Sequence, residues 1–283
     1  MKGVRGAIVR TPVLGRAVLF FFRAKTAGAY YGPLLARVFK WLIRSREVTN
    51  FTYDLEENNK RYLASMIADI ANIEFSTAMA YIREIDEDAK LKKHVADVIE
   101  SSGMAFMADK EVLFGRRIGW YVFARAMKPR VIFETGVDKG LGSCILAAAL
   151  KRNGADGYEG RYYGTDINPE AGYLLAGEYA KYGSILYGDS IESLRQFDGK
   201  IDLFINDSDH SAGYEAEEYR TISSKLSDRA IILGDNSHCT DELLQFSLQT
   251  NRHFAYFQEI PRDHWYPGAG IGISFKRPFG DDG

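Results

Sequence analysis

The residues after Gly115 constrain the fold most, because short runs of β-branched and aromatic residues alternate there with longer helical stretches. Such alternation is typical of a parallel sheet whose strands are joined by crossover helices. The expected strands are 130–134, 161–165, 184–187, 201–205, 230–234, 253–260 and 270–275, and the expected helices are 143–152, 169–182, 190–196, 213–226 and 240–250. The sequence therefore predicts an α/β, doubly wound, Rossmann-like fold with a seven-stranded, mostly parallel sheet and an antiparallel last strand.

A helical region is expected before this sheet. Between Asn50 and Gly103, apolar residues recur at steps of three and four, which marks the buried faces of successive helices, two of them near 76–85 and 87–100. We expect 50–112 to be a helical cap or oligomerisation region and 113–283 to form the α/β domain. Because these helices bury little surface on their own, we expect a homo-oligomer.

The charge of the chain is segregated. Residues 1–46 contain ten Lys and Arg and no Asp or Glu, which leaves 26 basic and 38 acidic residues, a net charge of -12, for the remainder. Lys and Arg interrupt every apolar run, so neither a membrane-spanning helix nor a signal peptide is expected. We expect 1–49 to be a basic amphipathic arm that either lies on an anionic membrane surface or packs on the protein body or a second subunit.

The composition excludes several classes of protein. A formal net charge of -2 disfavours a globally basic nucleic-acid-binding protein. Two cysteines are too few for a disulfide framework or a cysteine-based metal centre. We therefore expect a cytoplasmic protein, with membrane association through the arm as the alternative.

The first strand of the sheet ends in a glycine-rich turn, FETGVDKGLGS, that leads into a helix. Gly136, Gly140 and Gly142 let the backbone turn sharply and approach a ligand closely. Their spacing does not fit the dinucleotide motif G-x-G-x-x-G, which disfavours a nicotinamide-dependent reductase.

The next two strands also end in polar residues. Asp166 ends the second strand, where a carboxylate can accept two hydrogen bonds from a ribose diol. Asp189 and Ser190 follow the third strand and are suited to the edge of an adenine ring, although Asp189 is equally suited to cap the following helix. A glycine turn followed by these acids predicts a nucleoside site.

The fourth and fifth strands supply further acids. Their ends read DLFINDSDH and AIILGDNSH, which bring Asp207, Asp209, Asp235 and Asn236 to adjacent strand tips. Carboxylates this crowded repel one another unless a cation neutralises them or a proton is shared. Oxygen ligands without cysteine favour Mg²⁺ or a similar divalent ion.

In the order of these motifs, the region from about 113 to 275 resembles class I S-adenosylmethionine-dependent methyltransferases. It is most similar to the metal-dependent small-molecule O-methyltransferases of the catechol and macrolide-sugar type. The sequence DSDH resembles the DGDH of the sugar-modifying branch, and GDN resembles the paired ligands of the catechol branch. No lysine lies close to the fourth-strand acid, so the lysine base of the catechol enzymes has no obvious counterpart.

The resemblance implies S-adenosylmethionine and Mg²⁺ as cofactors. The residues that it assigns to S-adenosylmethionine are Glu134, Thr135, Gly136, Gly142, Ser143, Asp166, Ile167, Asp189, Ser190 and Asp207. The implied Mg²⁺ ligands are Asp207, Asp235 and Asn236.

Methyl transfer to a hydroxyl group requires a base that removes the proton. We expect Asp209 or His210 in this role, with His238 as the alternative. The expected acceptor is a small molecule such as a sugar, polyketide, phenol or lipid-linked glycan. Two alternatives stay open: a metal-independent N- or O-methyltransferase, and a non-catalytic nucleoside-binding protein recruited to membranes.

The aromatic and polar loop between the last two expected strands is the candidate acceptor site. Its residues Asp263, His264, Trp265 and Tyr266 can stack on a ring and bind hydroxyl groups. The alternative is a hairpin loop that covers the sheet edge.

Overall fold

The computed structural model describes residues 14–103 and 105–277. Within these residues the chain forms two compact units. The first combines the N-terminal segment up to Ser45 with the short segment 263–267, and the second holds 46–262 and the residues from Gly268 onward. The unit boundary near Ser45 agrees with the change in charge along the sequence.

The first unit is built on one long helix, α2 (Leu14–Arg44). Its C-terminal part packs against the segment 263–267, where Lys40 forms an ion pair with Asp263 and the rings of Trp41 and Trp265 lie 4.9 Å apart. In the described part of the chain, no helix is long and apolar enough to cross a membrane.

The second unit contains a seven-stranded sheet in the order β3-β2-β1-β4-β5-β7-β6. Its strands are β1 (Val131–Thr135), β2 (Arg161–Asp166), β3 (Gly183–Tyr187), β4 (Ile201–Asn206), β5 (Leu226–Gly234), β6 (His253–Gln258) and β7 (Gly270–Phe275). Neighbours among β1 to β5 are parallel, and β7 is antiparallel to both β5 and β6. The predicted antiparallel last strand is therefore confirmed, and it lies between β5 and β6.

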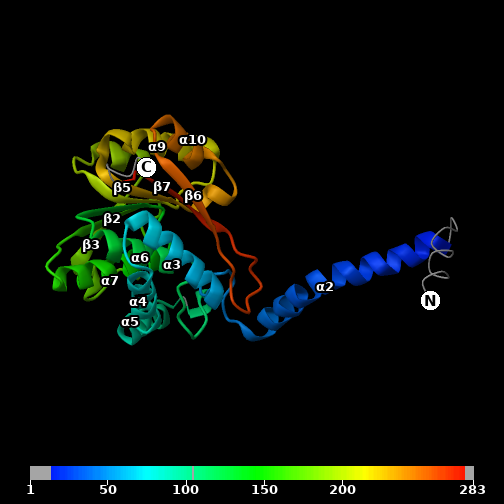
Figure 1. The fold of residues 1–283 in the computed structure, drawn as a ribbon. Coiled ribbons are helices and arrows are strands. Elements are labelled where there is room, and N and C mark those ends of the chain that lie inside the picture. The colour runs from blue at the N-terminus through cyan, green and yellow to red at the C-terminus, as the bar shows by residue number, and fades with distance from the viewer. Residues whose placement is uncertain (1–13, 104, 278–283) are drawn as a thin grey trace. The chain divides into compact units, whose positions relative to one another are not determined.

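Helices cover both faces of this sheet (Figure 1). On one face lie α6 (Arg117–Met127) and α7 (Leu141–Ala155), and on the other lie α8 (Ser190–Gln196), α9 (Ala212–Ile222) and α10 (Glu242–Gln249). Short 3₁₀ helices occur at Ala105–Met107, Tyr179–Tyr182, Ser223–Lys225 and Asp235–His238. The core under the second group of helices is formed by Phe133, Leu194, Ile201, Phe204, Tyr219, Ile222, Ile232, Leu243 and Phe246. The expected doubly wound fold is confirmed.

Three more helices, α3 (Glu57–Ala71), α4 (Phe75–Asp86) and α5 (Ala89–Ser101), belong to the same unit as the sheet. The first two pack on α6, and α5 packs on α7. The region expected as a separate helical cap is thus continuous with the α/β core.

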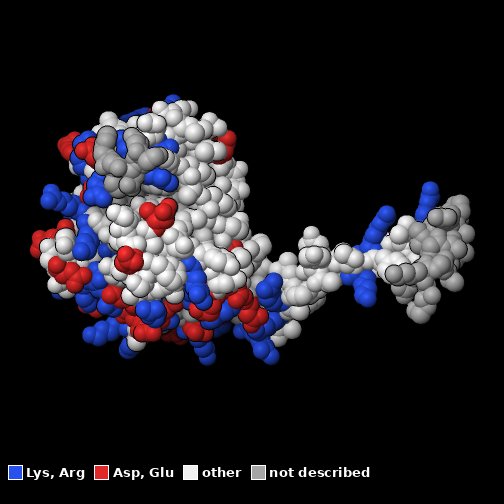
Figure 2. All heavy atoms as spheres, in the orientation of Figure 1, with Lys and Arg blue, Asp and Glu red and all other residues white. Residues whose placement is uncertain are grey.

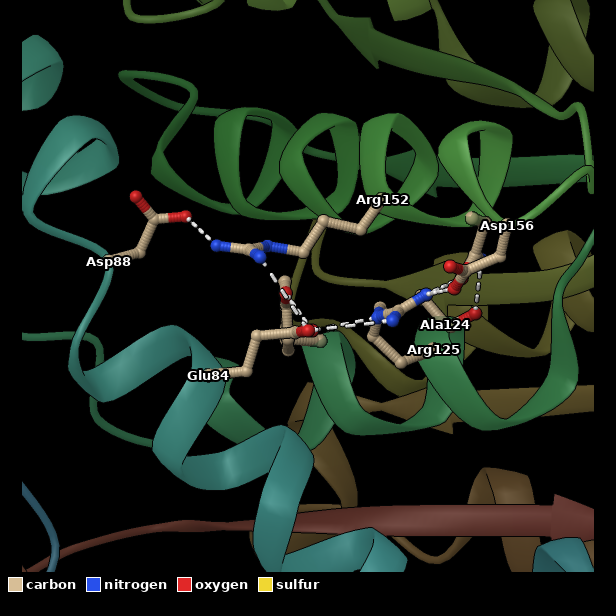
Figure 3. Close-up of polar contacts among 8 residues, drawn as sticks. Glu84, Asp88, Ala124, Arg125, Arg152 and Asp156 are labelled. Atoms are coloured by element: carbon tan, nitrogen blue, oxygen red, sulfur yellow. Dashed lines mark hydrogen bonds and ion pairs between the residues drawn. The ribbon is translucent and has the colours of Figure 1, made fainter.

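Figure 3 shows the polar network that joins α4 to α6 and α7. Glu84 accepts hydrogen bonds from the Tyr121 hydroxyl at 2.6 Å and from Arg125 Nε at 2.7 Å. Arg152 on α7 lies 3.6 Å from the same carboxylate and donates to Asp88 at 2.8 Å. Glu84 and Asp88 of the helical region thus supply counter-charges to both arginines, and Arg125 also pairs with Asp156 at 3.1 Å.

The sequence prediction fails at two elements. Residues 169–182 were expected to be helical, but only Tyr179–Tyr182 forms a short 3₁₀ helix. Gly172 and Gly177 adopt φ values of 75° and 55°, which no right-handed helix contains. The prediction also omitted α6, in which every residue from Ile118 to Arg125 is buried.

We expect Glu84→Ala to lower the free energy of unfolding by about 3 kcal/mol, because it leaves the Arg125 guanidinium, 7% exposed, without its main counter-charge. The matched control is Glu87→Ala, at an exposed position that follows α4, for which we expect a change within about 0.5 kcal/mol. Chemical unfolding followed by circular dichroism measures both. Equal losses in the two variants would contradict a stabilising role for the network.

Candidate functional site

A cavity of about 600 Å³ opens where the parallel strands end. In a doubly wound sheet this is the edge at which ligands bind. The lining residues come from the loops after β1 to β4 and from the start of α6: Arg116, Arg117, Gly136, Asp138, Thr165, Asp166, Ile167, Asn168, Ala171, Gly188, Asp189, Ser190, Asp207, Ser208, Asp209, His210 and Tyr214. Its volume is suited to one small-molecule ligand.

The turn after β1 forms one wall of this cavity and depends on Gly136. This residue has a φ of 78°, and a Cβ atom placed on it would lie 2.1 Å from the carbonyl oxygen of Asp207. Only glycine allows the turn to lie this close to the end of β4. The sharp turn expected at Gly136 is therefore present, and its close approach to a ligand stays a prediction.

Asp166 ends β2 with its carboxylate held at the cavity wall. One oxygen accepts the backbone N–H of Asp138 at 3.0 Å, and the other accepts the N–H of Asn168 at 2.8 Å. Each oxygen keeps a further lone pair, so the carboxylate is oriented by the backbone and can still accept hydroxyl groups of a ligand. The side chain of the next residue, Ile167, is 81% exposed and supplies an apolar surface beside it.

Asp189 both caps a helix and lines the cavity. One carboxylate oxygen accepts the N–H of Glu192 at 2.9 Å in the first turn of α8, and the other accepts the Tyr214 hydroxyl at 2.9 Å. Tyr214 also lies 2.8 Å from the Ser190 hydroxyl. The sequence left open whether Asp189 caps the helix or contacts a ligand, and its position is compatible with both.

The floor of the site is held together by Glu218 of α9. Its carboxylate accepts hydrogen bonds from Thr135 at 3.2 Å and from Ser208 at 2.8 and 2.9 Å, and it also bonds Ser190 and Asn206. One buried acid thus connects the ends of β1 and β4 with the start of α8. Burial raises its pKa from 4.5 to about 7 despite these donors.

Four of the residues expected to bind the cofactor, Glu134, Thr135, Gly142 and Ser143, lie behind the cavity wall rather than in it. Glu134 is 2% exposed and accepts the Tyr162 hydroxyl at 2.6 Å, which in turn lies 2.7 Å from the Ser143 hydroxyl. Burial raises the pKa of Glu134 to about 7. This chain of contacts orients the turn after β1, and direct cofactor contacts of these residues stay a prediction.

The acids that end β4 and β5 are neutralised by an arginine. Arg116, directly before α6, pairs with Asp235 through Nε and through Nη2, which lies 2.8 Å from Oδ2. The same Nη2 is 3.9 Å from Asp207 Oδ2. On its other side Arg116 Nη1 donates to the Tyr53 hydroxyl at 3.4 Å, and Tyr53 donates to Glu259 at 2.7 Å. The guanidinium is thus fixed between the two aspartates.

Both ways of balancing these crowded acids are present. The Arg116 guanidinium is the cation for Asp235. Burial, together with the neighbouring Asp235 charge, raises the pKa of Asp207 well above its usual range, which favours its protonated form. From the sequence, a neutralising cation and a bound proton were expected as alternatives.

These residues do not form the expected Mg²⁺ site. Of the four residues expected to converge, Asp209 turns its carboxylate away to the N–H of Ser211 at 2.7 Å, and Asp235 is occupied by Arg116. Asn236 Oδ1 is buried without a donor, but one amide oxygen and Asp207 do not make the oxygen cage that Mg²⁺ requires. Within 14–103 and 105–277, no group of three or more His, Cys, Asp or Glu side chains could hold a metal ion.

The three candidate bases differ in position. Asp209 and His210 both line the cavity and are exposed. The hydrogen bonds from Ser211 lower the pKa of Asp209, which makes it a weak base. His238 does not line the cavity, and its Nδ1 donates to the carbonyl of Asp235 at 3.0 Å. Of the three, His210 is therefore the candidate that lines the cavity and carries ring nitrogens that can accept a proton.

The predicted acceptor loop belongs to the unit of α2. There Asp263 pairs with Lys40 and Trp265 packs on Trp41, while Tyr266 N–H donates to His264 at 3.1 Å. These contacts account for the aromatic and polar character of the loop without a ligand. A role of Asp263, His264, Trp265 and Tyr266 in acceptor binding stays a prediction.

Sequence reasoning missed several residues of the site, above all Arg116 and Arg117. Both precede the apolar run 118–124. A helix that leads directly into β1 begins near the carboxyl end of that strand. Two arginines at the start of such a helix therefore lie beside the site, and this position in the sequence could have revealed them. Tyr214 and Glu218 gave no such signal, because their roles depend on how α9 packs beside α8.

Glu218 should make stability depend on pH. A folded-state pKa of about 7 against an ordinary 4.5 means that the folded protein binds the proton more tightly, so the free energy of unfolding falls as pH rises between these values. We expect Glu218→Gln to remove up to about 1.4 kcal/mol per pH unit of this slope. Denaturant unfolding at several pH values measures it, with exposed Glu170→Gln as the control. A slope unchanged in Glu218→Gln would show that the group does not titrate in this range.

Comparisons with known proteins were made for sequence and for structure. Residues 133–237 match the family model described as a methyltransferase domain. No curated protein matches the sequence.

Among solved structures, similar folds include an O-methyltransferase from Bacillus cereus in complex with SAH, with 15% identity and a TM-score of 0.48 over 65% of this chain and 91% of that one. The O-methyltransferase TomG from Streptomyces achromogenes, in complex with SAM, has 17% identity and a TM-score of 0.46 over 68% of this chain and 91% of that one. A methyltransferase from Geobacter sulfurreducens has 14% identity and a TM-score of 0.48 over 68% and 92%.

The family match covers the strand ends of β1 to β5, which carry most of the lining residues. It coincides with the part of the sequence on which the resemblance was based. Residues 133–237 thus match a methyltransferase domain, which confirms the resemblance to S-adenosylmethionine-dependent methyltransferases.

Proposed function

We propose that this protein transfers a methyl group from S-adenosylmethionine to a hydroxyl group of a small molecule. The observation that carries this proposal is the cavity beyond β1 to β4 within the methyltransferase domain, with Asp166 and Asp189 on its wall. The carboxylate of Asp166 is oriented for the ribose diol, and exposed Ile167 offers an apolar surface to the adenine ring.

The part of the cavity lined by Arg117 suits the methionine part of the cofactor, which carries a carboxylate, an ammonium and the sulfonium. Arg117 lines the cavity, and its buried Nε has no hydrogen-bond partner among the described residues. An unpartnered guanidinium nitrogen favours binding of a carboxylate. We assign the methionine carboxylate to Arg117, which places the methyl group toward the ends of β4 and β5.

The acceptor hydroxyl would be deprotonated by His210 as it attacks the methyl carbon in line with the departing sulfur. The His210 imidazole lies on the cavity wall where it can take this proton, whereas the lowered pKa of Asp209 makes its carboxylate a poor base. Asp209 is better suited to stabilise the imidazolium that forms on the neighbouring residue. Loop 263–266 remains a proposed contact for the acceptor.

No step is assigned to a divalent ion, because the residues implied as its ligands do not fit one. The guanidinium of Arg116 takes the place between Asp207 and Asp235 that a cation would need. This arrangement favours the metal-independent form of the reaction, in which transfer to an amine is an alternative to transfer to a hydroxyl group.

We expect S-adenosylhomocysteine to bind to the wild-type protein. Asp166→Ala should weaken this binding at least about tenfold, because the two hydrogen bonds from the ribose hydroxyls to the Asp166 carboxylate are lost. Calorimetric titration measures both, with Asp198→Ala at an exposed position as the control. Equal affinity in Asp166→Ala and in the control would remove Asp166 from the site. No binding to the wild type would refute the cofactor assignment.

We expect wild-type protein to show no saturable binding of Mn²⁺, used here as a spectroscopic substitute for Mg²⁺, because Arg116 already neutralises the two aspartates. Arg116→Ala should gain Mn²⁺ binding, and Arg116→Lys, which keeps the charge, should not. Electron paramagnetic resonance measures the free ion, and circular dichroism checks that each variant folds. Micromolar binding to wild type that is lost in Asp207→Asn would overturn this interpretation and restore the metal site.

A further inference from the structure

We infer that α2 is a docking element that lies on the surface of an anionic lipid bilayer. The helix belongs to the first unit of the chain, and its docking would be a property additional to the proposed methyl transfer. It is based on the charge, exposure and periodicity of this helix.

The charge of α2 has a single sign. Its 31 residues include no Asp or Glu, and its basic residues are Arg16, Arg23, Lys25, Arg37, Lys40 and Arg44. Figure 2 shows Lys and Arg in the outer part of the helix and near its C-terminal end, with uncharged residues between them. Lys40 pairs with Asp263 of the same unit, so the other five supply the excess positive charge.

The same helix exposes large apolar side chains. Six of them are between 56% and 71% exposed: Phe20, Phe21, Tyr31, Leu35, Phe39 and Leu42. Soluble surfaces seldom carry so many large apolar groups on one element unless they bind something.

Most of the basic residues lie away from one apolar stripe of the helix. At 100° per residue, Phe21, Leu35 and Phe39 fall within one narrow stripe, whereas Arg16, Arg23 and Arg37 point to the opposite side, and Lys25 lies beside the stripe. A helix with this division, a basic face and an aromatic face, is suited to lie in the plane of the membrane with its apolar side among the acyl chains. At 1.5 Å per residue it would extend for roughly 46 Å along the surface.

The charge pattern favours a lipid surface over a second copy of the helix. Two copies of α2 packed together would bring like charges close without any acid on the helix to pair with them. Anionic headgroups provide a dense layer of opposite charge, and each Lys or Arg near such a surface contributes about 1 kcal/mol. In the described residues no helix could cross the bilayer, which leaves surface binding as the form of membrane contact.

The contacts at the end of α2 connect this docking to the rest of the chain. Trp41 packs on Trp265, and Lys40 pairs with Asp263, so the segment 263–267 is attached to the helix. By its position in the sequence, this segment links β6 to β7. A docked helix would therefore hold one connection of the sheet at the lipid surface.

The test is flotation of the full-length chain with vesicles. We expect binding to phosphatidylcholine vesicles that contain phosphatidylglycerol, weaker binding at high salt, and none to phosphatidylcholine alone. Replacement of Arg16, Arg23 and Lys25 together by Glu should weaken binding by at least about a hundredfold. Glu is a good helix former and is favourable in the first turns, so this variant keeps the helix.

The matched control replaces three exposed lysines of the second unit, Lys90, Lys110 and Lys181, by Glu, which changes the net charge equally. We expect this control to bind as the wild type does. A second variant, in which Phe21, Leu35 and Phe39 are all replaced by Ala, should also abolish flotation, because the apolar stripe is lost while the helix propensity rises.

Two results would overturn the inference. One is a failure of the wild type to float with anionic vesicles, or equal flotation of the variant with Glu at positions 16, 23 and 25 and of the lysine control. The other is a lower molar mass of the helix variants in light scattering without any lipid dependence, which would assign α2 to a second copy of the chain. Neither result bears on S-adenosylhomocysteine binding, so the proposed function is tested separately.

Discussion

The carboxylates that end neighbouring parallel strands are forced together at one edge of the sheet, and their charge has to be balanced there. In this protein the balancing cation is Arg116, which is fixed between Asp207 and Asp235 by Tyr53 and Glu259 behind it. The cation arrives there because α6 leads directly into the central strand β1 and therefore begins at the edge where β1 ends. The position of one helix thus determines the electrostatics of the whole site.

This arrangement explains why aspartates at neighbouring strand ends can serve different purposes. Asp166 and Asp189 are held by backbone N–H groups and by a tyrosine hydroxyl, which orients their carboxylates at the cavity wall. Asp207 and Asp235 are held by a guanidinium instead, which leaves them poorly suited to bind a metal ion. The cavity at the strand ends therefore combines oriented carboxylates on its wall with a pair of aspartates that the protein itself neutralises.

Much of the fold could be predicted because parallel strands and crossover helices leave strong patterns in the sequence. The strand ends were located closely enough to place Asp166, Asp189 and Asp207 at one edge. The helix expected over 169–182 failed because Gly172 and Gly177 adopt left-handed conformations that apolar periodicity does not report. The metal site was predicted from residue types alone, and these cannot reveal a counter-charge that comes from Arg116, which lies far away in the sequence.

A crystal structure of the protein with S-adenosylhomocysteine, grown with Mn²⁺ present, tests the central claim most directly. The account predicts the ribose on Asp166, the methionine carboxylate near Arg117, and the Arg116 guanidinium between Asp207 and Asp235 with no metal ion there. Anomalous scattering from Mn²⁺ between these aspartates, with Arg116 turned away, would contradict it.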